Sequence, residues 1–425
     1  MLDKERKKRK HKKEMKSLKN KMSNHLVWFE SLTTKKQYDV LFLWKHEKRF
    51  NHIIEPTISK TRWGHVTKYP PNFKHFINKL KTQHIFRVNK QTLRENAIDL
   101  ILKIISIMKI FSGTSNPELA DSICEILNKN VLDGSFSRGR LKIDKFSDGE
   151  ILPLFEESVR GEDIIFVQST QHDNIIETLL VIDAAKRSDC KSFTLISPFQ
   201  GYSRQDKTDH LRSSIGSKML ADILETVGMS RVITIDLHAS SIQGFYNVPI
   251  IHLNGNKIFI EHIRKNQIED LTIIAPDQGA VKRASDFCKA FPDSTFAMIN
   301  KKRIKPNEIH SMELVGDVEG RNVVIVDDMA DTLGTLKKAS ELIMEKGAKS
   351  VRAIATHGIL SGAAMENLYT SQLTELMVSD SIPSTLQKEK DQVGDKLKVI
   401  SCDNIIARTI WGLTTKKSIH EINMI

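Results

Sequence analysis

The segment VVIVDDMADTLGTL, residues 323–336, joins an apolar run to three acids and a small polar turn. The β-branched run at its start predicts a buried strand, and the apolar spacing from Leu336 onward predicts a helix. Between them, Gly334 lets a ligand approach the backbone, and Thr332 and Thr335 offer hydroxyl donors at a helix N-terminus. We therefore predict that this strand–turn–helix segment binds a phosphate group. For the Asp-Thr pair alone a helix cap is the alternative, because both residues are common caps.

Three carboxylates lie beside this turn, at Asp327, Asp328 and Asp331, although carboxylates repel phosphate. An ionised carboxylate only accepts hydrogen bonds, whereas the vicinal hydroxyls of a sugar can donate two. A phosphate-binding turn with carboxylates close by therefore predicts a site for ribose 5-phosphate. No GxxxxGKS or GxxxxGKT segment occurs in the chain, which excludes a Walker-type nucleotide loop.

Outside this segment, short runs rich in Val and Ile alternate with helical patterns along residues 104–358. Strands that alternate with helices indicate parallel sheets, so we predict an α/β fold with two domains that join near residues 250–258. The predicted strands lie within residues 104–113, 163–169, 192–199, 231–240, 271–277, 296–301, 321–328 and 350–358. The predicted helices between them include residues 174–188, 217–227 and 336–348.

Polar clusters follow several of these strands at the point where each strand ends. They are Asp236-Leu237-His238, the run PDQG at 276–279, and PFQGYSRQDKTD at 198–209. In open parallel sheets, ligands bind beyond the carboxyl ends of the strands. We therefore expect these clusters and the segment 323–336 to form one site.

Positive charge is concentrated in the N-terminal quarter of the chain. The whole chain has a formal charge of +12, but residues 1–21 carry 11 Lys/Arg and 3 Asp/Glu, and residues 22–108 carry 15 and 6. The rest of the chain is mildly acidic. This basic extension also contains Trp28, Trp44 and Trp63, so nucleic-acid binding through it is one hypothesis. A targeting or solubilising arm is the alternative.

The sequence also limits where the protein is expected to work. The longest apolar run, residues 98–111, is short and interrupted by Asp99, Lys103 and Lys109, so we expect no membrane span. The first 20 residues lack the apolar core of a secretory signal. The four cysteines form no CxxC pair, which argues against a zinc module and indicates a reducing compartment. We expect a cytoplasmic protein, or an organellar one if the basic extension is a targeting segment.

From Lys109 to the C-terminus the sequence resembles the ribose-phosphate pyrophosphokinases, also called PRPP synthetases. The matching segments occur in the family's order: KIFSGTSNPELADSI, KFSDGE, ESVRGEDIIFVQS, YSRQDK, IDLHASSIQGFY, PDQGAVKRA, NKKRIKPNE, VGDVEGRNVVIVDDMADTLGT and ATHGILSG. The resemblance implies two type I phosphoribosyltransferase-like domains, with parallel sheets flanked by helices, at residues 109–252 and 253–409. It also implies that residues 410–425 complete the first domain, while residues 1–108 have no counterpart.

The resemblance further implies pyrophosphoryl transfer from Mg-ATP to the 1-hydroxyl of ribose 5-phosphate, giving PRPP and AMP for nucleotide biosynthesis. Mg²⁺ is the implied cofactor, and His238 and Asp277 are its implied ligands, directly or through water; a strand-end histidine without metal is the alternative for His238. Lys301 and Arg303 are the implied catalytic pair, where cations stabilise the charge of the transferred group; a solvated basic loop is the alternative. The implied ribose 5-phosphate residues are Asp327, Asp328, Asp331, Thr332, Leu333, Gly334 and Thr335. The implied ATP residues are Phe146, Asp148, Glu150, Arg204 and Gln205.

Family members assemble, so the resemblance implies a homo-oligomer in which dimers form a hexamer. Phe146 and Glu150 are then expected to reach the ATP site of a neighbouring subunit. The residues that match the family's regulatory phosphate site are Arg160, Ser240 and Gln243.

The sequence departs from the family's pattern at several positions. Gln278 and Ala280 replace residues of the usual Pro-Asp-Ala-Gly-Gly segment, and a Cβ at position 280 puts the backbone conformation there in question. Gly201 and Ser203 alter the usual Pro-Tyr-Ala-Arg-Gln-Asp segment, which bears on nucleotide preference. His252 lies near the expected regulatory site, where the family often has another residue.

Two other functions share part of this pattern. A catalytically silent PRPP-synthetase-associated subunit, a regulatory protein, typically has a disturbed catalytic loop, but INKKRIKPNEIHSMELVGD at residues 299–317 contains no insertion. An ordinary phosphoribosyltransferase would share the turn after Asp331 but would not need YSRQDK or DLHA. We therefore favour the synthesising enzyme, and the silent regulatory subunit is the alternative.

Overall fold

The structure, a computed structural model, describes residues 57–61, 64–68, 109–130, 136–208, 211–266, 268–305, 308–382, 391–415 and 418–419. The chain divides into two units, Met1–Ile101 and Leu102–Ile425. In the first unit the described residues form one antiparallel hairpin, β1 (Thr57–Thr61) with β2 (Gly64–Lys68). The rest of the predicted basic extension lies outside the described residues, so its hypotheses stay predictions. All of the segments that carry the family resemblance lie in the second unit.

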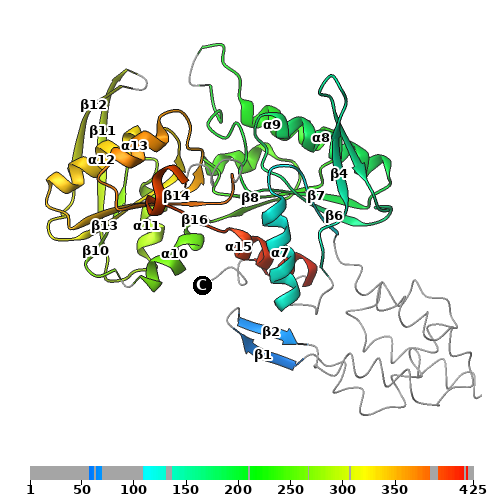
Figure 1. The fold of residues 1–425 in the computed structure, drawn as a ribbon, viewed down its shortest axis with the longest axis horizontal. Coiled ribbons are helices and arrows are strands. Elements are labelled where there is room, and N and C mark those ends of the chain that lie inside the picture. Colours follow the sequence, from blue (N-terminus) through cyan, green and yellow to red (C-terminus); the bar gives the residue numbers. More distant parts are fainter. Residues whose placement is uncertain are drawn as a thin grey trace, which may run out of the picture. The chain divides into compact units, whose positions relative to one another are not determined.

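A five-stranded parallel sheet occupies the first part of the second unit, in the order β3-β6-β7-β8-β9. Helices α8 (Asp173–Arg187) and α9 (Gly216–Val227) cover one face, and α7 (Pro117–Asn130) covers the other (Figure 1). A separate antiparallel hairpin, β4 (Leu141–Lys145) with β5 (Ile151–Phe155), packs against α8. The strands of the sheet are β3 (Lys109–Ser112), β6 (Asp163–Val167), β7 (Ser192–Ser197), β8 (Arg231–Ile235) and β9 (Ile250–Leu253).

A seven-stranded sheet follows, in the order β12-β11-β10-β13-β14-β15-β16, with only the β11–β12 pair antiparallel. Helices α12 (Gly334–Glu345) and α13 (Ala364–Thr370) cover one face. Helices α10 (Asn256–Lys265) and α11 (Val281–Cys288) cover the other. The strands are β10 (Leu271–Ala275), β11 (Thr295–Lys305), β12 (Glu308–Val315), β13 (Asn322–Ala330), β14 (Ser350–Gly358), β15 (Glu375–Ser379) and β16 (Leu397–Ile400).

The predicted α/β class is confirmed, and each of the eight predicted strands and three predicted helices is present. The prediction succeeds because these strands are apolar throughout: every residue of β10 is buried, as a central parallel strand requires. Helix α12 buries Leu336, Ala339, Ser340 and Ile343, the spacing of one helical face. The sequence prediction left several short or edge strands unassigned, and also the longer helices α7 and α10.

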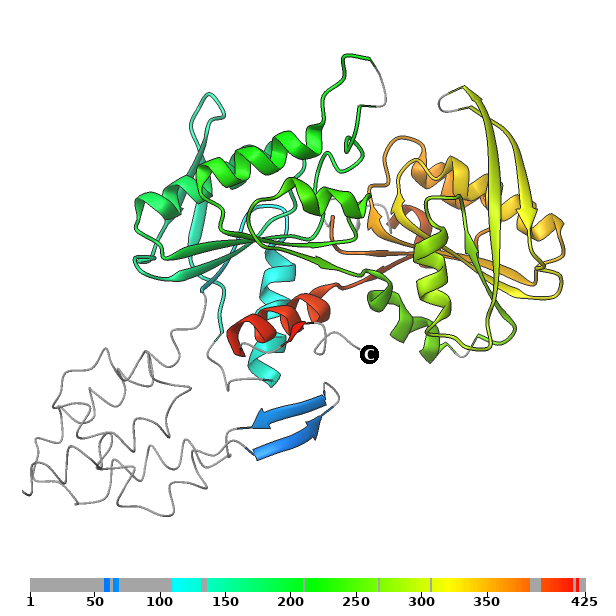
Figure 2. The same ribbon diagram turned by 180° about the vertical axis from the view of Figure 1, so that it is seen from behind.

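One hydrophobic core runs along the same side of both sheets. It joins α7, α10 and α11 to the last helix, α15 (Asp403–Thr415), and includes Ile123, Phe259, Ile273 and Trp411 (Figure 2). Helix α15 packs directly against α7, and the Ser122 hydroxyl donates to the Asp403 carboxylate. We propose on this basis that the C-terminal segment belongs structurally to the first α/β domain, which otherwise ends at β9.

Among the described residues, none of the helices combines the length and the apolar character that crossing a membrane requires.

Candidate active site

The predicted phosphate turn, residues 331–335, lies between the carboxyl end of β13 and the first turn of α12. Leu333 has a left-handed backbone conformation (φ 61°, ψ 1°), which is unfavourable for a residue with a Cβ. Gly334 has no positive φ, and a Cβ built on it would meet, among the described residues, only Asn367 Nδ2 at 4.0 Å. Neither the backbone nor the packing requires glycine at position 334, so the open space there suits the close approach of a ligand.

Asp327 and Asp328, near the end of β13, are two adjacent, partly buried acids. Burial and the neighbouring Asp328 carboxylate raise the pKa of Asp327 above its usual range. Burial acts in the same direction on Asp328, but the hydrogen bond to His238 and the charge of Arg283 hold the pKa of Asp328 below its usual range. The pair therefore suits a ligand that brings hydrogen-bond donors or positive charge.

Three contacts join a basic side chain from the list of predicted site residues to a predicted acid from another segment. His238 Nδ1 lies 2.8 Å from Asp328 Oδ2, and this contact raises the pKa of His238 although burial opposes it. Lys301 Nζ donates to Asp277 Oδ2 at 3.0 Å. The third pair joins Arg204 Nη1 to Asp331 Oδ2 at 2.6 Å. The structure thus brings together the carboxyl ends of β8, β10 and β13 and the loop after β7, as the sequence pattern indicated.

The two predicted catalytic residues lie on β11, which pairs with β12 as an antiparallel ribbon. The Lys301 side chain is only 6% exposed and points its ammonium at Asp277. For Arg303 the structure describes the backbone only, two residues further along the same strand. The ribbon therefore places Lys301 beside Asp277. We call the four acids Asp277, Asp327, Asp328 and Asp331 the acid cluster.

Two residues that were given no individual role in the sequence prediction support this cluster. Asp236, which directly follows β8, is buried and has a positive φ of 39°. Its carboxylate forms an ion pair with Arg283 from α11, accepts the Thr356 hydroxyl of β14, and accepts the Gly255 N–H at 3.0 Å. Asp236 was visible in the sequence only as one acid after a strand. No local sequence signal connects it to Arg283, which lies 47 positions later.

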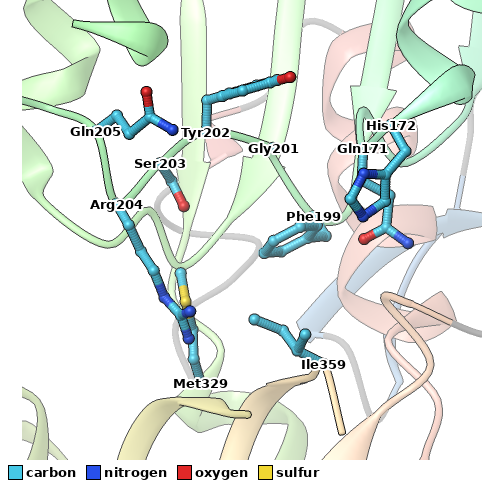
Figure 3. Close-up of a pocket in the computed structure, with 10 residues that line it drawn as sticks. All are labelled: Gln171, His172, Phe199, Gly201, Tyr202, Ser203, Arg204, Gln205, Met329 and Ile359. Carbon is cyan, nitrogen blue, oxygen red and sulfur yellow. The ribbon is translucent and has the colours of Figure 1, made fainter. Parts of the chain in front are cut away.

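A pocket of about 260 Å³ opens beside the phosphate turn. Phe199, Met329 and Ile359 form its apolar part, and Arg204 and Gln205, the predicted ATP contacts, lie around the same space (Figure 3). Gln171, His172, Gly201, Tyr202 and Ser203 complete the lining. An apolar wall with a few polar groups is typical of a small-molecule site.

Other predicted residues lie elsewhere. Phe146, Asp148 and Glu150 are at the tip of the β4–β5 hairpin, where Phe146 is 54% exposed and does not line the pocket. The predicted regulatory residues make contacts outside the acids of the site. Ser240 and Gln243 share the short helix η2 (Ser240–Phe245), where Gln243 Nε2 donates to Ser240 O at 3.0 Å, whereas Arg160 contacts Asp189 at 3.7 Å.

Comparison with known proteins identifies the family of this chain. The family described as the N-terminal domain of ribose phosphate pyrophosphokinase matches residues 108–228, and the phosphoribosyl synthetase-associated domain matches residues 271–423. A ribose-phosphate pyrophosphokinase of Porphyromonas gingivalis is 42% identical over 313 residues, which cover 73% of this chain and 96% of the relative. One of Vibrio cholerae is 41% identical over 316 residues, covering 73% and 98%. The chain belongs to the ribose-phosphate pyrophosphokinase family.

A solved structure of the same family supports the fold. The crystal structure of phosphoribosylpyrophosphate synthetase from Mycobacterium smegmatis has a TM-score of 0.66 and 34% identity, and the match covers 73% of this chain and 99% of that chain. The family resemblance predicted from residue 109 onward is therefore confirmed. Both matched regions begin after residue 107, so nearly all of the basic extension lies outside them.

Local geometry accounts for three departures from the pyrophosphokinase pattern. Ala280 has ordinary right-handed angles (φ −83°, ψ −8°), so its Cβ causes no strain. Gly201 is required, because a Cβ there would lie 1.9 Å from Thr170 O. His252 is largely buried, which lowers its pKa, and its Nε2 accepts the Leu237 N–H at 2.9 Å. His252 therefore supports the backbone beside His238.

The acid cluster fits a magnesium ion that is bound mainly through water and substrate. Among the described residues, no three His, Cys, Asp or Glu side chains converge as a protein cage for a metal would require. Mg²⁺ usually keeps several waters and takes only one or two carboxylates together with substrate phosphates. Asp277 would supply such a carboxylate, and the pKa of Asp327 is raised first by burial and then by the neighbouring carboxylates of Asp328 and Asp277. His238 Nδ1 contacts the Asp328 carboxylate, so this nitrogen is not free to ligate the ion directly.

The Arg283–Asp236 pair yields a prediction about stability. Arg283→Met should lower the free energy of unfolding by about 3 kcal/mol, because it leaves a buried carboxylate without its cation. Asp236→Asn in the same chain should restore part of the loss. Urea unfolding followed by circular dichroism measures both. Lys282→Met removes one charge from the neighbouring, exposed position and should cost less than about 0.5 kcal/mol; equal effects at 282 and 283 would contradict the assignment.

Proposed function

We propose that this family member transfers the pyrophosphoryl group of Mg-ATP to the 1-hydroxyl of ribose 5-phosphate, producing PRPP and AMP for nucleotide biosynthesis. The observation that carries the proposal is the shared site. Here Asp331 of the phosphate turn contacts Arg204 of the predicted ATP loop, and Asp277 after β10 contacts the Lys301 ammonium. Relatives that are about 40% identical along nearly their whole length are named ribose-phosphate pyrophosphokinases, which does not favour a silent regulatory subunit.

The phosphate turn anchors the sugar substrate in this proposal. Backbone N–H groups at the start of α12 bind the 5-phosphate, with help from the hydroxyls of Thr332 and Thr335. The carboxylates of Asp327 and Asp328 accept hydrogen bonds from the ribose hydroxyls. Hydroxyl donors also relieve the repulsion between these two acids, so substrate binding and carboxylate ionisation support each other.

The pocket beside Arg204 and Gln205 receives the nucleotide. Its apolar side chains contact the adenosine part, and Arg204 exchanges its contact with Asp331 for a phosphate oxygen. Mg²⁺ would be held by Asp277 and by phosphate oxygens, with His238 as a partner through water. The ion neutralises phosphate charge when it is bound.

Transfer needs the 1-hydroxyl in line with the β-phosphorus of ATP. As the new O–P bond forms, the hydroxyl releases its proton to solvent, the bond from the β-phosphorus to the bridging oxygen of AMP breaks, and negative charge gathers on that oxygen. Lys301 and Arg303 supply cations for this charge. Before substrates bind, the contact with Asp277 holds the Lys301 ammonium inside the site.

Incubation with γ-labelled ATP and ribose 5-phosphate tests the function directly. The label should appear in PRPP, together with an equal amount of AMP, because the β- and γ-phosphates move as one group. Release of the label as free phosphate, or no turnover by the pure, folded protein, would exclude the proposed reaction.

Gly334→Val should raise the KM for ribose 5-phosphate at least about tenfold and change the KM for ATP little. The branched side chain fits the protein but fills the space where the phosphate is expected. A loss of about 1.4 kcal/mol in binding corresponds to that factor. Steady-state kinetics with each substrate varied in turn gives both constants, and Gly334→Ala should show a smaller effect in the same direction. An unchanged KM for ribose 5-phosphate would remove the turn from the site.

Lys301→Ala and Arg303→Ala should each lower kcat by about 10²-fold or more, while ATP binding stays close to normal. A cation that acts on charge developed during transfer contributes mainly to the transition state. The double variant should be less than multiplicatively worse, and Arg303→Lys should not fully restore activity. Lys302→Ala removes a neighbouring charge and serves as the control. A near-normal kcat in both alanine variants would show that Lys301 and Arg303 belong to a solvated basic loop without a catalytic role.

We also propose that the active unit is a homo-oligomer, of dimers assembled into a hexamer. The exposed Phe146 and its hairpin partners Asp148 and Glu150 lie outside the pocket of their own chain, which supports a role in a neighbouring subunit's ATP site. Specific activity should therefore fall when light scattering shows dissociation to monomers on dilution. Full activity in a verified monomer would contradict a shared site.

A regulatory phosphate at Arg160, Ser240 and Gln243 would require that assembly to bring Arg160 to the other two.

A further inference from the structure

The phosphate turn is supported from outside by Asn367, a residue of α13. Asn367 Nδ2 donates to the backbone oxygen of Thr332 at 2.9 Å. The same nitrogen is the atom that lies 4.0 Å from a Cβ built on Gly334. Asn367 therefore touches the turn at the carbonyl side of the peptide group that joins Thr332 to Leu333.

The direction of this one peptide group decides whether the turn can bind phosphate. In a trans peptide the C=O and N–H bonds point in opposite directions, so a carbonyl that is held outward turns the following N–H inward. Within the described residues the Leu333 N–H has no protein acceptor. It is thus a free donor at the N-terminus of α12, where anions bind.

The backbone does not hold this conformation without help. Leu333 has left-handed angles, which cost a residue with a Cβ roughly 1 kcal/mol or more. Such a conformation persists only when its surroundings fix it. Asn367 fixes the carbonyl on one side of Leu333, and the hydroxyl of Ser361 donates to the Asp331 carboxylate at the start of the turn.

Helix α13 is anchored firmly enough to serve as this support. Leu360 N–H, just before it, donates to Ala330 O of β13 at 3.0 Å. At its C-terminal end, the Lys396 ammonium donates to three backbone oxygens, those of Leu368, Tyr369 and Ser371, at 3.1, 3.1 and 3.0 Å. A lysine that binds the last carbonyls stabilises a helix end. The helix in turn buries Ala364 and Leu368.

We propose that Asn367 is a positioning residue for ribose 5-phosphate: its amide holds the Thr332–Leu333 peptide so that the Leu333 N–H faces the 5-phosphate. The proposal rests on the function proposed above. Asn367 acts through the turn, so its loss weakens sugar-phosphate binding and leaves the transfer step itself largely intact.

Steady-state kinetics of the full-length protein tests this role. Asn367→Ala should raise the KM for ribose 5-phosphate about 5- to 10-fold, as expected for one lost hydrogen bond, with kcat and the KM for ATP within about twofold. Asn367→Asp keeps the shape but cannot donate and adds negative charge beside Gly334, so its KM for ribose 5-phosphate should rise further. Glu366→Gln, an exposed neighbour on the same helix, should leave all three constants unchanged.

The possible results separate this inference from the proposed function. Equal effects on both substrates, or a fall in kcat without a change in the KM for ribose 5-phosphate, would overturn the positioning role while PRPP synthesis stands. If the unaltered protein makes no PRPP, the proposed reaction fails. Calorimetric titration with ribose 5-phosphate then tests the inference. We expect the unaltered protein to bind ribose 5-phosphate more tightly than Asn367→Ala does. Equal binding by both proteins, or no binding by either, would refute it.

Discussion

The geometry of the site depends on the buried ion pair between Arg283 and Asp236. Asp236 also binds the Thr356 hydroxyl and the Gly255 N–H, so a single carboxylate ties β8 to α11, to β14 and to the start of α10. His238 lies two residues after Asp236, and the charge of Arg283 helps to keep Asp328 ionised. Because a buried charge without its partner is costly, the two sheets cannot separate here without a large loss of free energy.

Around that fixed pair, three basic side chains of the site contact a carboxylate. Arg204, Lys301 and His238 each contact a carboxylate from another strand end. In the proposed reaction, substrate phosphates would replace the carboxylates as partners of the basic side chains, and substrate hydroxyls would donate to the released carboxylates. Such an exchange needs little rearrangement of the backbone, which is the benefit of a preorganised polar site.

Much of the fold could be predicted because its central strands are continuous apolar runs and its main helices bury one regular face. The turn at 331–335 was also predictable, since strand, acids, glycine and helix are contiguous in the sequence. Asn367 and Arg283 could not be found in this way, because each contacts a partner more than 30 positions away and no local period records such a contact. The hairpin tip at Phe146 was recognised through the family resemblance. Within this chain, however, Phe146 is exposed and does not line the pocket, and the sequence could not predict this.

The packing of α15 against α7 has a consequence for how the chain reaches its native state during synthesis. The ribosome makes α7 well before α15, the helix that completes their shared core. Until then, apolar residues such as Ile123 and Leu127 lack their final partners. Contacts between such distant segments close slowly and leave hydrophobic surface exposed. A chain that lacks α15 is therefore expected to expose the apolar face of α7.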